Sequence, residues 1–293
     1  MKVLMTTDGS KHAATAMLSA SRLLRKNELE TDVLCIAPAL ALATPDAIRV
    51  TYTEDVRRQS QRIVRDAQNV LRPEGVHANS LVKFGSPVDD ILHFAANYDL
   101  VVVGAHGKHE RRQPGLGPVS SHVVQNAGRS VMVGRELCNE NNYRVLVALD
   151  GSDASFNAMR ALETYFDVSS MDVTLMHVIE MPWARLGVAA EADDSEGSEI
   201  VDYRQDLERE MRRFADVAID RGSRQLEKWG IPGTTIIEEG DPALELVSHA
   251  EEGNYDLIVT GATGASDVKH ALLGSVSVKL AWNAPCSVVV VRS

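Results

Sequence analysis

The sequence has few cysteines and no long apolar run. Its three cysteines, Cys35, Cys138 and Cys286, form no Cys-x-x-Cys pair, which argues against a disulfide framework or a zinc site and favours a reducing compartment. No apolar run approaches the roughly 20 residues that a membrane-spanning helix needs. The first residues are strand-like and lack the pattern of a signal peptide. We therefore expect a cytoplasmic protein with no membrane partner.

Aromatic residues are scarce, and positive charge does not predominate. Aromatics make up 5% of the 293 residues, and the formal net charge is −11. This charge argues against a nucleic-acid partner but is compatible with a nucleotide held in a local pocket. The chain is 44% hydrophobic and 24% charged, as in soluble globular proteins, and its length fits about two domains.

Apolar runs alternate with helical patterns in the first half of the chain. Strands are expected at 2–7, 31–37, 79–84, 100–103 and 130–133, with helical segments between them. The run at 100–103 is apolar throughout, as is typical of the centre of a parallel sheet. The order βαβαβαβαβ predicts an α/β fold with a doubly wound, five-stranded parallel sheet.

The same series then starts again, which predicts a tandem duplication. Asp150-Gly151-Ser152 repeats Asp8-Gly9-Ser10 at an offset of 142 residues, and Tyr255-Asp256-Leu257 repeats Tyr98-Asp99-Leu100 at 157. The polar residues 139–142 read as a linker, so we predict domain 1 at 1–138 and domain 2 at 143–293. The growing offset predicts an insertion in the acidic segment 182–199. That segment fits a solvated loop, with a lid or a contact to a basic partner as the alternative.

A glycine pattern closes each repeat. In domain 2, Gly261-x2-Gly264-x9-Gly274-Ser275 follows an apolar run and leads into a predicted helix at 276–284. Glycines let the backbone approach an anion, and a helix start offers free N–H groups and a positive dipole end. The spacing is neither a Walker motif nor a dinucleotide-binding fingerprint. It nevertheless predicts a phosphate-binding site.

The combined layout resembles the universal stress protein family over the full length of both halves. The features that carry the resemblance are Asp-Gly-Ser after the first strand, Gly-x-Pro after the third, and the glycine pattern with its serine after the fourth. The family contains ATP binders and non-binders, and the glycine pattern separates them. The resemblance implies two doubly wound, adenine-nucleotide α-hydrolase-like (Rossmann-like) domains packed as a pseudo-dimer through their last strands. It also implies a homodimer of tandem chains.

The resemblance further implies ATP, ADP or AMP as ligand, with Mg near Asp150. Asp150 would lie beside the ribose and phosphates, the Val178 backbone would line the adenine pocket, and Gly274, Ser275 and Ser277 would hold the phosphates. The full set of nucleotide-binding residues expected in domain 2 is Ala148, Leu149, Asp150, Val178, Thr260, Gly261, Gly264, Gly274, Ser275, Val276 and Ser277. No histidine pair shows metal-ligand spacing.

Domain 1 departs from the pattern at Pro118, which replaces the serine that domain 2 has at 275. Proline lacks both the hydroxyl and the N–H, so two phosphate donors are lost together. Ala37 also replaces Val178, while Lys108, His109, Arg111 and Arg112 offer compensating charge. A weaker second site is expected at Thr7, Asp8, Ala37, Gly104, Gly107, Gly117, Val119 and Ser120.

Three functions compete on the sequence. The first is an ATP-binding regulatory or stress-response protein with an unknown protein partner. It would hydrolyse ATP slowly at most, because no Walker lysine, general base or arginine finger can be identified. The second is an adenylating enzyme, although the Ser-Gly-Gly-x-Asp-Ser and His-x-Gly-His motifs of such enzymes do not occur. The third is a dimeric scaffold that binds no nucleotide.

Overall fold

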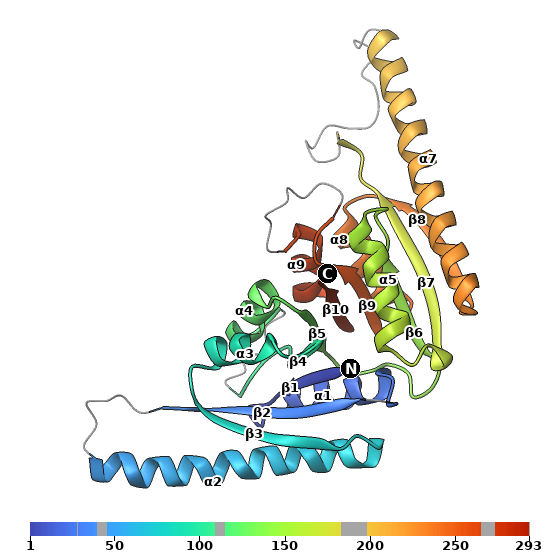
Figure 1. Ribbon diagram of the computed structural model, residues 1–293. Helices are drawn as coiled ribbons and strands as arrows, with labels where there is room; N and C mark the ends of the chain where they lie inside the picture. Colours follow the sequence, from blue (N-terminus) through green and yellow to red (C-terminus); the bar gives the residue numbers. More distant parts are fainter. Residues whose placement is uncertain (28, 40–45, 109–114, 183–197, 265–272, 293) are drawn as a thin grey trace.

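The computed structural model describes residues 1–27, 29–39, 46–108, 115–182, 198–264 and 273–292 (Figure 1). Domain 1 contains β1 (Lys2–Thr6), α1 (Lys11–Leu23), β2 (Glu30–Pro38), α2 (Asp46–Leu71), the 3-10 turn η1 (Arg72–Glu74), β3 (Ala78–Gly85), α3 (Pro87–Ala95), β4 (Leu100–Gly104), α4 (Pro118–Asn126) and β5 (Ser130–Gly134). Each predicted strand is present at nearly its predicted bounds.

Domain 2 repeats this order. It contains β6 (Tyr143–Ala148), α5 (Asp153–Tyr165), η2 (Val168–Ser170), β7 (Met171–Ile179), α7 (Ser198–Trp229), β8 (Gly233–Glu239), α8 (Pro242–Glu252), β9 (Leu257–Gly261), α9 (Ser275–Asn283) and β10 (Ser287–Val291). The lengthened connection lies between β7 and α7, as the offset predicted. Most of segment 182–199 falls outside the described residues, so the prediction of a solvated acidic loop stays a prediction.

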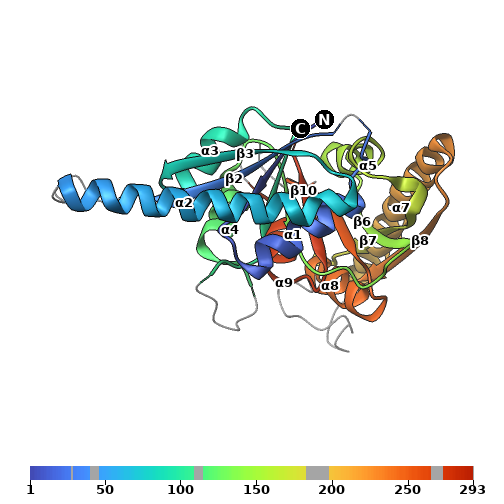
Figure 2. The same ribbon diagram turned by 90° about the horizontal axis from the view of Figure 1, so that it is seen from below.

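All ten strands form one sheet, in the order β3-β2-β1-β4-β5-β10-β9-β6-β7-β8. Within each half the neighbouring strands are parallel, which confirms the predicted doubly wound domains. Helices α1, α2, α5 and α7 cover one apolar cluster, and α3, α4, α8 and α9 cover the other. Figures 1 and 2 show α2 and α7 at the two ends of the molecule, over the outer strands β2–β3 and β7–β8.

The two halves meet through their last strands, as predicted. Strands β5 and β10 pair antiparallel, with Val288 opposite Val133 and Val290 opposite Val131. Every residue of both strands is buried. An unpaired strand edge with apolar side chains would favour aggregation, and the pairing removes one such edge from each domain.

Two arginines, one after each of the paired strands, form hydrogen bonds to the opposite domain. Arg135, just after β5, donates from its guanidinium to the carbonyls of Ala281 (2.6 Å) and Cys286 (3.1 Å). Arg292, just after β10, donates to the carbonyls of Val124 and Gln125, both at 3.0 Å. Each arginine therefore lies at the carboxyl end of a helix, where the dipole favours a cation. Burial lowers the pKa of Arg135 to about 10, so it keeps its charge at neutral pH.

A second contact joins the ends of α1 and α5. Leu24 and Phe166, both fully buried, form an isolated antiparallel bridge between the domains. Two backbone hydrogen bonds flank it, from Arg25 N to Tyr165 O (2.9 Å) and from Asp167 N to Leu23 O (3.0 Å). The α1 helix stops at Leu23 because Leu24 turns extended to make this bridge.

Asp256, the middle residue of the repeated Tyr-Asp-Leu, holds the linker. Its carboxylate is fully buried and accepts from the N–H groups of Cys138 (2.7 Å), Asn139 (3.0 Å) and Arg144 (2.8 Å), and from the Asn139 amide (2.8 Å). Its counterpart Asp99 is exposed and accepts from Lys2 N at 2.7 Å. The same residue type therefore serves the linker in domain 2 and a strand start in domain 1.

Among the described residues, no helix combines the length and the apolar character that crossing a bilayer demands.

Replacing Arg135 should weaken the joint between the domains. Arg135→Met keeps the aliphatic stem but leaves the Ala281 and Cys286 carbonyls without their charged donor, so the free energy of unfolding should fall by about 1.5–3 kcal/mol. Urea unfolding followed by circular dichroism measures this. Arg129→Ala is the control, because Arg129 makes an exposed bond to Ala96 within domain 1 and its loss should change stability by less than about 0.5 kcal/mol. Equal effects would contradict the assignment.

Asp256→Asn should loosen the linker. The amide keeps one acceptor oxygen but turns an NH2 group toward N–H donors, so we expect a loss of about 1–3 kcal/mol. Limited proteolysis should also cut faster near residues 138–143. The matched control is Asp99→Asn at the equivalent exposed position. Unchanged cleavage in both variants would show that Asp256 does not hold the linker.

Candidate functional site

The site predicted in domain 2 lies at the carboxyl end of β6, where the order of strands across the sheet reverses. Strand β6 has β7 on one side and β9 on the other. The helix after β6 covers one face of the sheet, and the helix after β9 covers the opposite face. In open α/β sheets this switch point leaves a crevice between the loops, and ligands bind there.

Asp150 organises the loop after β6. Its Oδ1 accepts from the backbone N–H (2.9 Å) and the hydroxyl (2.6 Å) of Ser152. Ser152 in turn caps α5 by accepting from Ser155 N at 3.2 Å. A side chain at Gly264 would come within 2.9 Å of Asp150 Oδ2, so the loop after β9 passes directly beside this carboxylate.

In domain 1, Asp8 makes the equivalent contact between the two loops. Asp8 Oδ1 accepts from Ser10 N, and Oδ2 accepts from Lys108 N, both at 2.8 Å. Burial raises the pKa of Asp8, but the hydrogen bonds from Ser10 and Lys108 outweigh it and hold the pKa below its ordinary value. Gly107 leaves room for this contact, since a Cβ there would lie 2.8 Å from Asp8 Oδ2. The predicted residues Asp8 and Gly107 are therefore brought together.

Gly261, expected beside the ribose and phosphates, has a packing role of its own. A Cβ at this position would come within 2.9 Å of the Ala154 backbone. Glycine is thus required for α5 to approach the end of β9. Gly104 has the same relation to the start of α1, at 2.9 Å from Ala13 N. These two glycines would be needed with or without a ligand.

Two of the predicted phosphate donors already have acceptors within the protein. Gly274 N donates to Ala262 O (2.7 Å), and the buried Ser277 hydroxyl donates to Gly261 O (2.6 Å). These bonds fix α9 to the end of β9. Ser120 and Gly117 make the equivalent bonds in domain 1, to Gly104 O and Ala105 O.

The remaining donors are at the start of α9. The first N–H bonded within the helix belongs to Val278, which donates to Gly274 O at 3.1 Å. The N–H groups of residues 275–277 therefore have no acceptor within α9, and Ser275 is exposed. In α4 the equivalent first position is Pro118, which contributes no N–H, so Val119 and Ser120 supply the remaining groups there.

The other predicted residues line the strand ends. Leu149 is buried, and its carbonyl accepts from His177 Nδ1 at 2.7 Å. Ala148 and Val178 are half-buried against the core on the α8–α9 side, and Thr260 is buried in β9. In domain 1, Thr7 and Ala37 are buried at the equivalent strand ends. These positions therefore lie at strand ends beside the two candidate sites.

Domain 1 differs in the side chains beside its glycine loop. The rings of His12 and His106 meet edge to face with centroids 5.4 Å apart, where domain 2 has Ala154 and Thr263. Lys108 is described, but His109, Arg111 and Arg112 lie outside the described residues. No group of three His, Cys, Asp or Glu side chains suited to a metal ion occurs in the ranges described.

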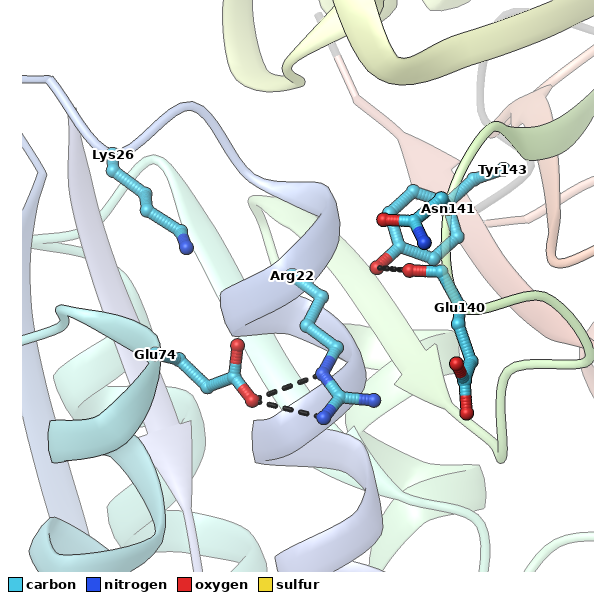
Figure 3. A pocket seen from close by; sticks show the side chains of 6 residues that line it. All are labelled: Arg22, Lys26, Glu74, Glu140, Asn141 and Tyr143. Atoms are coloured by element: carbon cyan, nitrogen blue, oxygen red, sulfur yellow. Dashed lines mark hydrogen bonds and ion pairs between the residues drawn. The ribbon is translucent and has the colours of Figure 1, made fainter.

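A cavity of about 490 Å³ lies elsewhere, at the junction of the domains (Figure 3). Arg22 pairs with Glu74 at 3.0 Å on the domain 1 side, and Tyr143 donates to the Glu140 carbonyl (3.2 Å) on the linker side. Lys26 and Asn141 complete its lining. Tyr143 begins β6, so this cavity is roughly 20 Å from Asp150 by strand geometry. It is separate from the predicted nucleotide site.

Comparisons with known proteins agree with the duplication. The model of the Universal stress protein family matches residues 1–135 and again 142–292. A universal stress protein of Mycolicibacterium smegmatis is 24% identical over 306 residues, covering 99% of this chain and 96% of its own. Another, from Methanocaldococcus jannaschii, is 31% identical over 155 residues, covering 52% of this chain and 84% of its own.

The fold is also found in solved structures. A universal stress protein from Archaeoglobus fulgidus matches with a TM-score of 0.69 at 21% identity, covering 99% of this chain and 98% of its own. Because the family model accounts for both halves of the chain, the protein belongs to the universal stress protein family, as a tandem member with two domains.

Proposed function

We propose that domain 2 binds ATP, or ADP or AMP, and that the protein acts as a stress-response regulator through nucleotide-dependent conformation or partner binding. The observation that carries this proposal is the convergence of three groups at the β6–β9 switch point. These are the Asp150 carboxylate, the Gly264 backbone beside it, and the open start of α9 at Ser275.

The start of α9 is suited to phosphate oxygens. The N–H groups of residues 275–277 and the exposed Ser275 hydroxyl are donors without acceptors inside the helix, at the positive end of its dipole. Mg bound near Asp150 would offset the repulsion between the carboxylate and the phosphates. We therefore assign ligand contacts to Ser275, Val276 and the backbone N–H of Ser277, while Gly274 and the Ser277 hydroxyl act chiefly by fixing α9.

Domain 1 is proposed as the weaker site. Its Asp8, Gly107 and α4 reproduce the geometry, but Pro118 removes one N–H and one hydroxyl from the helix start. Each hydrogen bond to a charged group contributes about 1.5–3 kcal/mol, so losing two weakens binding by about a hundredfold or more.

A non-binding scaffold is the second candidate. It is favoured by the structural roles of Gly261, Gly274 and Ser277, which explain part of the glycine pattern without any ligand. In that case purified protein would contain no nucleotide, and ATP would not raise its melting temperature. A homodimer of tandem chains, an unidentified protein partner and a cytoplasmic location belong to both candidates as proposals.

Ser275→Pro should weaken ATP binding in domain 2 by about a hundredfold or more while leaving the fold intact, because proline is tolerated at the first helical position. Isothermal titration calorimetry measures the affinity. Mass spectrometry of the nucleotide released on denaturation shows what the purified protein carries.

The matched variant is Pro118→Ser, which should create or strengthen a site in domain 1 without altering domain 2. If wild type and Ser275→Pro carry ATP at equal occupancy, the site assignment is wrong.

A further inference from the structure

An exposed aromatic side chain lies beside the predicted nucleotide site. Phe214, in the middle of α7, has 52% of its surface exposed in a chain with few aromatics. Its ring lies over the loop after β6, because a Cβ added to Gly151 would come within 2.7 Å of the ring. Gly151 has φ of +82°, so glycine is favoured there both by the backbone conformation and by the ring.

The Phe214 ring lies near His177 and near a small apolar cluster. Its centroid lies 6.1 Å from that of His177, whose Nδ1–H donates to the Leu149 carbonyl. Burial lowers the pKa of His177, which favours the uncharged form of its ring. Met211, one turn before Phe214, packs with Ile179, Met181 and Ala215 in a small apolar cluster at the end of β7.

These contacts place Phe214 beside the position expected for the base of the ligand. Gly151 follows Asp150 directly, and Asp150 lies beside Gly264 and the loop that leads to α9. A nucleotide with its phosphates at the start of α9 and its ribose at Asp150 would direct its base toward the ends of β6 and β7. Phe214, His177 and the apolar cluster meet there. Domain 1 has the aliphatic Ile63 over Gly9 at the equivalent place.

We infer that Phe214 binds the base of the nucleotide by stacking, and that this aromatic wall makes domain 2 select a purine nucleotide over a bare polyphosphate. The inference rests on the proposed function. Aromatic side chains stack on the flat faces of bases, and one such contact changes affinity by about tenfold or more. With Ile63, domain 1 lacks this wall in addition to the donors lost at Pro118.

The test compares ATP with inorganic tripolyphosphate, which has the charges but no base. In wild type and Phe214→Leu, calorimetry should give about a tenfold weaker affinity for ATP in the variant and an unchanged affinity for tripolyphosphate. Phe214→Tyr, which keeps an aromatic ring, should bind ATP with about the affinity of wild type. Val217→Ala is the matched control, since Val217 is 60% exposed on the same helix, and it should have no effect on either ligand.

A fluorescent readout reports stacking directly. The triphosphate of 2-aminopurine riboside should be quenched on binding to wild type and regain fluorescence in Phe214→Leu. Equal ATP affinities and equal quenching in the two proteins would overturn the role of Phe214 while leaving nucleotide binding in place. Absence of ATP binding to wild type would overturn the proposed function and this inference with it.

Discussion

The antiparallel pairing of β5 with β10 is the interaction on which the rest of the structure depends. It turns two five-stranded sheets into one sheet of ten strands, which among the described residues has β3 and β8 at its edges. Both paired strands are buried along their whole length, so separating the domains would expose apolar surface and unpaired backbone groups together. Arg135 and Arg292 strengthen the joint by bonding to the helix ends of the opposite domain.

The joint and the candidate nucleotide site share the short helix α9. Its first turn carries the proposed phosphate donors, and near its end the Ala281 carbonyl accepts from Arg135. Trp282 on the same helix also lies against Gly115 of domain 1, because a Cβ at Gly115 would come within 2.7 Å of the indole ring. A ligand that ordered the start of α9 would therefore act on an element already fixed to the other domain.

The two domains share the hydrogen bonds that hold their loops, but they differ in the side chains at the candidate ligand sites. Asp8 and Asp150 hold their loops in the same way, and Ser120 and Ser277 make the same bond to a strand-end carbonyl. The groups that would meet a ligand differ, with Pro118 in place of Ser275 and Ile63 in place of Phe214. Conserving the buried hydrogen bonds preserves the fold, because an unsatisfied buried polar group costs about 1–3 kcal/mol.

The sequence by itself determined the family, the duplication and the order of strands and helices along each domain. These features depend on local periodicity and on motif spacing, which can be recognised in a single sequence. Edge-to-edge packing was also predictable, from the family resemblance together with two largely apolar last strands that need partners. The glycine pattern also predicted which loops form the candidate site, and that assignment stays a prediction.

Only the tertiary structure decided which residues of the pattern serve the fold and which face outward. Gly261 and Ser277 look like ligand residues in the sequence, yet one makes room for α5 and the other bonds to a strand end. Conversely, Phe214 reads in the sequence as one more apolar position of an amphipathic helix. Its exposure and its place over Gly151 depend on how α7 packs on β7, a contact between distant segments that no local pattern encodes.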